Sequence, residues 1–213
     1  MLATGLVQEA SKEVQPMGDA STATYSGGDP DLDILAGVAT EDKSVLEFDL
    51  IPLTDVISFR YVFASEEFDE YCNQYNDSFG FFISGPGIPP GPFSNSAQNI
   101  ALLPATTMTV TINNICATDN GVPNGFYSWW NGDDGTFYTY DRFTYVYTAS
   151  ITVQCGQTYH LKMAIGDAVD RVVDSGIFLE ENSLTSDNFA EAPTFSNPLT
   201  GNYLVEGCSD VTV

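Results

Sequence analysis

The chain has 213 residues, and its 6 Lys and Arg against 29 Asp and Glu give a formal net charge of −23. So few cations cannot displace the counterions of a nucleic acid or hold the chain on an anionic membrane surface. Apolar residues make up 43% of the chain, too many for a disordered acidic tail. We therefore expect a folded acidic domain with no nucleic-acid partner and no direct membrane insertion.

Short runs rich in β-branched and aromatic residues recur along the chain, bounded by Gly, Pro, Asn and Asp. They predict strands at 45–50, 56–64, 79–84, 108–112, 143–153, 158–165 and 176–180. The run at 79–84 is almost continuously apolar, which is typical of a strand covered on both faces. Gly156 and Gln157 separate two long runs and predict a tight hairpin turn.

Helical periodicity is nearly absent, and the best helix candidate is the short segment 66–71. Many strands with minimal helix predict an all-β fold, a jelly-roll-like β-sandwich with long loops. The proline-rich stretch 85–96 predicts a rigid irregular loop, and 113–140 predicts a long insertion. We expect the domain to occupy residues 1–190, with 191–213 as a linker and the start of a following module.

The chain has four cysteines, Cys72, Cys116, Cys155 and Cys208. None stands in a C-x-x-C pair and His160 is the one histidine, so we do not expect a structural zinc site. An even number of cysteines suits disulfides formed in an oxidising compartment. Three pairings are open, and four buried free thiols are the alternative.

Acidic and amide side chains crowd two segments that each follow a predicted strand. The candidate metal ligands are Glu66, Glu67, Asp69, Glu70, Asn76, Asp77, Asp167, Asp170 and Asp174. Crowded carboxylates repel one another unless a proton or a cation neutralises them, and calcium accepts roughly 6–8 oxygen ligands in flexible geometry. If the two strands are neighbours, both segments lie at one edge of the sandwich and could share calcium. Solvated acidic loops are the alternative.

A third acidic segment, 29–33, resembles the opening of an EF-hand loop. Ile34 stands where that loop needs Gly, and Thr40 stands where it needs a bidentate Glu, so we reject the motif. The acidic segment 132–135 is flanked by glycines and predicts a turn.

Both tryptophans, Trp129 and Trp130, lie close to Tyr127 in the long insertion. Exposed aromatic side chains on a loop can stack on sugar rings or anchor a protein partner; the alternative is that they fix the loop to the sandwich. Catalysis has little support, because Glu66 and Glu67 are adjacent and would point to opposite faces of a strand. No G-x-S-x-G motif accompanies the histidine, so we do not expect an enzyme.

Several segments in order resemble the choice-of-anchor L family, namely 61–71, 76–86, 99–104, 155–165 and 174–183. The resemblance spans residues 1–184. The opening residues look like the middle of the family's usual N-terminal region, which implies that the chain lacks part of it. The resemblance implies an extracellular or cell-surface module of bacteria, frequent in Bacteroidetes, that serves adhesion or surface assembly. It implies no catalytic residues.

Together these observations predict a secreted, non-catalytic binding or adhesion module that is stabilised by calcium. Its expected partners are other surface proteins or further copies of itself. One alternative is a structural subunit of a surface filament. The other is a carbohydrate-binding module that uses the segment containing Trp129 and Trp130.

Overall fold

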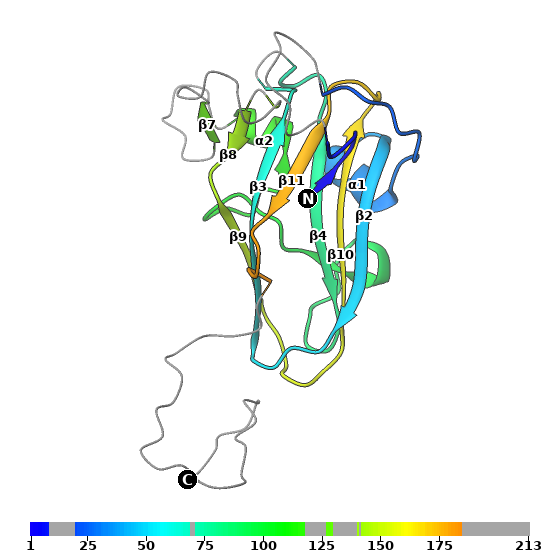
Figure 1. Ribbon diagram of the computed structural model, residues 1–213. Helices are drawn as coiled ribbons and strands as arrows, with labels where there is room; N and C mark the ends of the chain where they lie inside the picture. The colour runs from blue at the N-terminus through cyan, green and yellow to red at the C-terminus, as the bar shows by residue number, and fades with distance from the viewer. Residues whose placement is uncertain (9–19, 69–70, 118–126, 130–139, 141, 185–213) are drawn as a thin grey trace, which may run out of the picture.

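The computed structural model describes residues 1–8, 20–68, 71–117, 127–129, 140 and 142–184, in which two antiparallel sheets pack face to face (Figure 1). Sheet A has the order β1 (Leu2–Ala3), β11 (Ser175–Leu179), β3 (Val56–Ser65), β8 (Arg142–Thr144) and β7 (Tyr127–Trp129), and β9 (Tyr147–Thr152) also pairs with β3. Sheet B has the order β2 (Thr40–Leu50), β10 (Tyr159–Ala168), β4 (Ser78–Ser84) and β5 (Gln98–Asn99), and β6 (Val110–Thr111) also pairs with β4.

The long strands alternate between the two sheets along the chain. β2, β4 and β10 lie in sheet B, whereas β3, β9 and β11 lie in sheet A. This confirms the predicted all-β sandwich, and the repeated crossing between sheets is the jelly-roll type of connection. The predicted hairpin at Gly156 is wrong, because β9 pairs with β3 and β10 pairs with β2 and β4. A turn with Gly156 at φ 76° is present, but it carries the chain from one sheet to the other.

Two predicted strands are shorter than their residue types suggest. β6 ends at Thr111 because the helix α2 (Ile112–Ala117) begins at the next residue. The run at 143–153 is split into β8 and β9 by Tyr145 and Val146, which are 52% and 50% exposed. Strand-forming residue types continue through that break, so the sequence pattern alone does not reveal it.

The described residues of the helix predicted at 66–71, which are 66–68 and 71, are not helical, although Tyr71 N donates to Glu67 O at 3.1 Å. A helix forms instead at α1 (Pro30–Ala36). Asp29 caps its first turn and Pro30 occupies its first position, both of which favour a helix start. The acidic segment that superficially resembles an EF-hand is therefore a capped helix.

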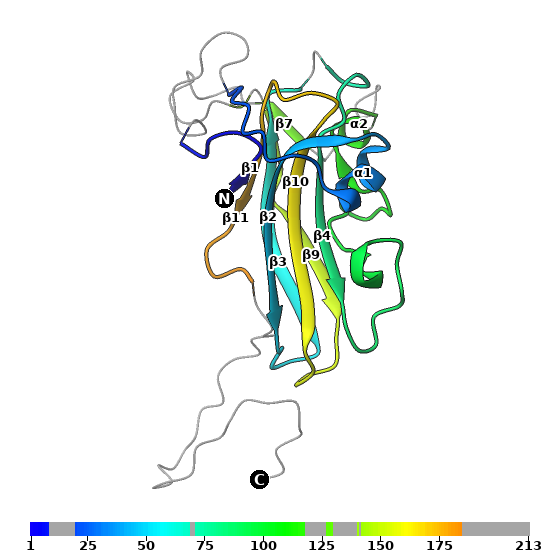
Figure 2. The ribbon, with the colours of Figure 1, turned by 90° about the vertical axis from the view of Figure 1, so that its right-hand side faces the viewer.

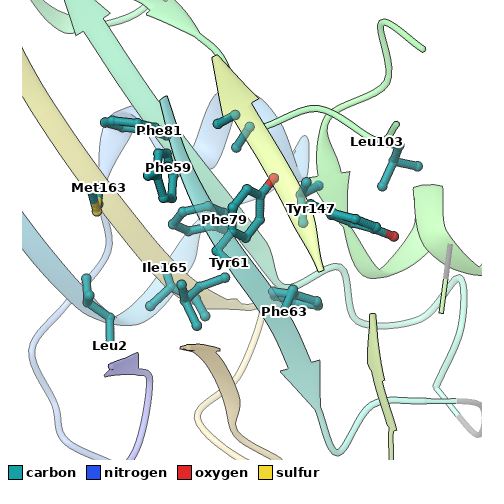
Figure 3. Packing of buried hydrophobic residues seen from close by; sticks show 14 of the residues in the cluster. Leu2, Phe59, Tyr61, Phe63, Phe79, Phe81, Leu103, Tyr147, Met163 and Ile165 are labelled. Carbon is teal, nitrogen blue, oxygen red and sulfur yellow. The ribbon is translucent and has the colours of Figure 1, made fainter. Parts of the chain in front are cut away.

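The main core lies between the sheets and is rich in aromatic side chains (Figure 3). Phe59 of β3 and Phe81 of β4 meet edge to face, with ring centroids 4.2 Å apart. The ring centroid of Tyr61 lies 5.2 Å from that of Phe79 and 5.9 Å from that of Tyr147. Because successive side chains of a strand point to opposite faces, every second residue of β3 contributes to this core.

The helix α1 packs against the upper part of the outer face of sheet B, as Figure 2 shows. Leu32 of α1 is fully buried in a second apolar cluster with Phe82 and Ala164. A Cβ at Gly166 would lie 2.9 Å from Leu32 Cδ1, so glycine allows the helix to approach β10 closely. β4 is thus buried on both faces, as its continuous apolar run predicts.

A disulfide joins Cys72 to Cys116 and ties the loop after β3 to α2. Cys155 is disulfide-bonded as well, and Cys208 lies outside the described residues. The expected linker at 191–213 also lies outside them, so the proposed domain boundary stays a prediction. Within the described ranges, no helix is both long and apolar enough to cross a membrane.

Candidate functional site

Acidic side chains meet at the end of the sandwich where β3 and β10 finish and where β4 and β11 begin, the upper end in Figure 1. β10 pairs with β4 and β11 pairs with β3. The two acidic segments of the sequence therefore lie at one end of the fold. The strands that precede them, β3 and β10, are not neighbours in one sheet as the prediction assumed, because they belong to the two facing sheets. We call Glu67, Asp77, Asp167, Asp170 and Asp174 the acidic end cluster.

Asp77 lies at the centre of this cluster, directly before β4, and is 1% exposed. Its Oδ1 accepts a hydrogen bond from the backbone N–H of Ala168 at 2.9 Å. Its Oδ2 accepts one from the hydroxyl of Ser175 at 2.7 Å. Burial raises the pKa of Asp77 to about 7, because these hydrogen bonds offset only part of the loss of solvation.

Asp167 lies at the end of β10, next to an irregularity in its pairing with β2, and is 1% exposed. Neither of its carboxylate oxygens has a hydrogen-bond partner in the described part of the chain. The hydroxyl of Thr4 is close enough to lower the pKa of Asp167 as a hydrogen-bond donor, and a protonated Asp167 can donate to Asp77. By geometry, however, Thr4 Oγ1 donates to the carbonyl of Ser175 at 3.4 Å. Burial, and then the charge of Asp77, raise the pKa of Asp167 to about 11.

Glu67 follows β3 and is also 1% exposed. Its Oε2 is buried without a hydrogen-bond partner among the residues that the structure describes. Burial is the main cause that raises the pKa of Glu67 to about 9, and the charges of Asp77 and Asp170 add to it. At neutral pH, and when no cation neutralises them, Glu67 and Asp167 therefore favour the protonated form, whereas Asp77 is close to half protonated.

The remaining predicted ligands differ in their roles. Asp174 accepts hydrogen bonds from the backbone N–H of Thr22 at 3.1 and 3.2 Å, and its carbonyl oxygen accepts one from Glu66 N at 3.2 Å. Asp170 is half-buried in the turn after β10, where its carboxylate accepts a hydrogen bond from Val172 N. The structure therefore brings Glu66, Glu67, Asp77, Asp167, Asp170 and Asp174 to the same end of the sandwich.

Asn76 has a structural role in the described fold. Its amide nitrogen donates to the carbonyl of Ala36 at 3.0 Å, and its Oδ1 accepts from Asn113 N at 2.9 Å. This side chain thus connects the segment before β4 to α1 and α2. Asp69 and Glu70 lie outside the described residues.

The sequence reading missed Asp42, which is fully buried in β2. Its Oδ2 accepts a hydrogen bond from Thr24 N at 2.8 Å, and its Oδ1 lies 3.6 Å from Arg171 Nε. The charge of Asp42 contributes to the raised pKa of Asp167. Asp42 precedes the predicted strand 45–50 and stands in a polar stretch that gives no local signal of burial, so only the pairing of β2 with β10 could reveal this neighbour.

No group of three or more His, Cys, Asp or Glu side chains within the described ranges stands ready to hold a metal ion. The carboxylates of the acidic end cluster share an end of the fold, but they do not yet form a coordination shell. A bound cation would require some of these side chains to turn toward it.

The other candidate residues lie apart from this cluster. Tyr127 and Trp129 belong to β7, which pairs with β8 in sheet A, and Trp130 lies outside the described residues. His160 is partly exposed on β10, with Nδ1 2.7 Å from Asp49 Oδ1 and Nε2 2.7 Å from Glu47 Oε1. These hydrogen bonds raise the pKa of His160. They pair both ring nitrogens with carboxylates of β2, which is a structural role.

A model of the choice-of-anchor L domain matches residues 1–185, which include every strand described above. The chain belongs to the choice-of-anchor L family. No curated protein and no solved structure matches the chain. Choice-of-anchor L domains are a non-catalytic type of surface domain, which makes this chain a cell-surface or secreted module. The acidic end cluster lies wholly inside the matched choice-of-anchor L domain.

Proposed function

We propose that this choice-of-anchor L domain is a non-catalytic binding module of a bacterial surface protein, and that calcium stabilises its acidic end. One observation carries the calcium proposal. Both oxygens of Asp167 are buried without a hydrogen-bond partner in the described structure, beside the charge of Asp77. A buried carboxylate without partners is costly unless it is protonated or bound to a cation.

Protons and calcium are the two ways to neutralise this cluster. Protonation leaves carboxyl oxygens that accept no hydrogen bond, as at Asp167 and Glu67. Calcium would use those same oxygens as ligands, since it prefers carboxylates and tolerates irregular geometry. Extracellular calcium modules typically bind with Kd values of roughly 10⁻⁴–10⁻³ M, which is adequate for a site outside the cell.

Two cationic side chains, those of Arg171 and Lys162, pair with carboxylates that are not part of the acidic end cluster. Arg171 pairs with Glu41 at 2.6 Å and with Asp42 at 3.6 Å. Lys162 lies on the outer face of sheet B with Asp29 and Asp31 as its partners. Arg171 and Lys162 are therefore engaged with carboxylates outside the cluster, which supports a divalent ion as the group that neutralises Asp167.

The proposed ligands are Asp167 and Glu67, with Asp170 completing the shell from the turn after β10. Asp77 keeps both of its oxygens in hydrogen bonds with Ala168 and Ser175, so it supports the site mainly by its charge. Asp170 is only half-buried, and it can turn inward at less cost than a residue within a strand. That movement supplies the coordination shell that the described side chains lack.

The test is the thermal stability of the chain in excess chelator and in millimolar calcium, for the natural protein and for Asp167→Asn. We expect calcium to raise the Tm of the natural protein, because a ligand that binds the folded state stabilises it. Asn resembles protonated Asp, so the variant should keep its Tm in chelator and lose the calcium response. Asp55→Asn, at an exposed site before β3, is the matched control and should respond normally. An unchanged Tm of the natural protein would exclude calcium.

The binding part of the proposal needs its own test. A glycan array separates sugar binding from protein binding, with Trp129→Ala and Trp130→Ala as variants. Loss of a glycan signal in both variants would favour the carbohydrate-binding alternative, and no signal for the natural protein would exclude it. Filaments whose number grows with protein concentration in electron micrographs would favour the surface-fibre alternative.

A further inference from the structure

Lys162 lies within β10, a strand that runs beside α1 in Figure 2, and its side chain contacts residues at the start of that helix. Its Nζ lies 2.8 Å from Asp29 Oδ1 and 2.8 Å from Asp31 Oδ2. The side chains of Lys162, Asp29 and Asp31 are only 10%, 7% and 2% exposed. The ring of Phe82 covers the ammonium group at 5.5 Å. An amine and two carboxyl groups are thus held together with little access to water.

The two carboxyl groups are held in different ways. Asp31 Oδ1 accepts hydrogen bonds from the backbone N–H and the hydroxyl of Ser94, at 2.7 and 2.9 Å. Burial acts to raise the pKa of Asp31, but the hydrogen bonds from Lys162 and Ser94 outweigh it, and the net pKa is lowered. Asp31 therefore remains an ionised base that can accept a proton.

Asp29 is placed as an electrophile. Its Oδ1 accepts the backbone N–H groups of Asp31 and Leu32, at 3.0 and 3.4 Å, in addition to Lys162 Nζ. Donors fixed around one carboxyl oxygen stabilise negative charge that develops there during attack on the carbon. The geometry thus assigns different roles to two carboxyl groups that are equally close to the amine.

We propose that Lys162 and Asp29 join in an intramolecular amide bond, with Asp31 as the proton carrier. Asp31 accepts a proton from the ammonium, and the free amine attacks Cγ of Asp29. The Nζ–Cγ bond forms, the Cγ–Oδ2 bond breaks, and Oδ2 leaves as water with two of the three ammonium protons. Asp31 ends as the carboxylate that it was at the start, and nothing is oxidised or reduced.

The second carboxylate is the feature that an ordinary ion pair does not explain. One carboxylate neutralises one ammonium, so the other leaves an excess negative charge in a site almost closed to water. Amide formation neutralises Lys162 and Asp29 together and leaves Asp31 with its Ser94 hydrogen bonds. The product ties β10 covalently to the start of α1.

The ion pair itself opposes the reaction. Burial acts to lower the pKa of Lys162, but the hydrogen bonds of Asp29 and Asp31 outweigh it, so the net pKa is raised and the free amine is scarce. Close placement offsets this, since well-oriented groups react with effective molarities of roughly 10⁵–10⁸ M. We therefore expect the bond to form after folding, slowly and once per chain.

The test is the intact mass of the full chain, reduced and denatured after prolonged incubation in the folded state. The natural protein should be one water lighter than its sequence predicts, and digestion should yield a branched peptide that joins Lys162 to Asp29. Lys162→Arg, Asp29→Ala and Asp31→Ala should each have their full sequence mass. Asp29→Asn should lose ammonia in place of water, because the side-chain amide nitrogen then leaves as NH₃ when Lys162 Nζ bonds to Cγ.

Asp49→Asn, an exposed substitution on β2, is the control and should still lose water. Circular dichroism shows whether each variant folds, but the natural protein alone decides the matter. A full sequence mass for the folded natural chain would overturn the proposal. So would a loss of water that maps to an Asp-Gly succinimide elsewhere, for which the peptide digest is the check.

Discussion

The hydroxyl of Ser175 donates a hydrogen bond to Asp77 Oδ2 at 2.7 Å, and this contact joins the two sheets at the acidic end. Ser175 begins β11 in sheet A, whereas Asp77 directly precedes β4 in sheet B. The same Oγ lies 2.9 Å from Ser65 Oγ at the end of β3. A small polar network therefore connects the two sheets at this end of the sandwich, whereas apolar side chains connect them in the main core.

Ser175→Ala should destabilise the fold by about 1–3 kcal/mol, because it leaves Asp77 Oδ2 buried without its donor. The free energy of unfolding in urea is the measurement. Ser150→Ala, at an exposed position of β9, should change that free energy by less than about 0.5 kcal/mol. Equal effects of the two substitutions would show that the contact between the sheets contributes nothing.

Without calcium, stability should fall as the pH rises from roughly 5 to 8. The folded-state pKa of Asp77 is raised from 3.8 to about 7, and that of Glu67 from 4.5 to about 9. Between the ordinary and the raised pKa values, the folded chain holds protons that the unfolded chain has already released. The free energy of unfolding therefore decreases as the pH rises. Each such proton contributes a slope of about 1.4 kcal/mol per pH unit.

Thermal melts in chelator at several pH values measure this dependence. They are best made in a His160→Gln background, because Asp49 and Glu47 raise the pKa of His160 and its contribution falls in the same direction. Asp77→Asn should flatten the slope. A Tm that stays constant or rises across this pH range would contradict the raised pKa values. If calcium binds the ionised cluster, its stabilising effect should grow with pH.

Removing the Cys72–Cys116 disulfide should cost about 4 kcal/mol on the chain-entropy estimate, given its sequence separation of 44 residues. The double variant Cys72→Ala with Cys116→Ala tests this without disturbing Cys155. Its free energy of unfolding is compared with that of the natural protein under oxidising conditions. A difference below about 1 kcal/mol would show that the core alone holds the loop after β3 against α2.

Relative to the ion-paired chain before any Lys162–Asp29 amide forms, Lys162→Met should destabilise the fold by about 3–5 kcal/mol, because Asp29 and Asp31 are left as buried carboxylates without their cation. Combining it with Asp29→Asn and Asp31→Asn should recover part of the loss, since neutral amides carry no charge. Urea titration measures both variants.

Arg60→Met removes the exposed pair with Glu180, whose side chains are 51% and 46% exposed, and should cost at most about 1 kcal/mol. A similarly small loss for Lys162→Met would mean that its site is open to water.

The family could be recognised from the resemblance of several segments in order. The all-β class and most strands could be predicted because alternation of apolar and polar residues follows directly from the geometry of a strand. The pair of acidic segments was also visible, since each follows such a run. α1 was missed although its signals are local. Asp29 before Pro30, with Gly37 after the last turn, indicates a capped helix. The alternating carboxylates of 29–33 also resemble an EF-hand loop, and that resemblance does not predict a helix at this position.

Local sequence determined which segments are extended, where the chain turns and where negative charge gathers, because these depend on neighbouring residues. The tertiary structure decided which strands pair, and with that the partners of each charged group. Gly156 marks a turn in either case, but only packing sends β9 and β10 to different sheets. Asp42 acts on Asp167 through its charge, and Lys162 pairs with Asp29 and Asp31, although these residues come from segments far apart in the chain, so only the fold brings them close together.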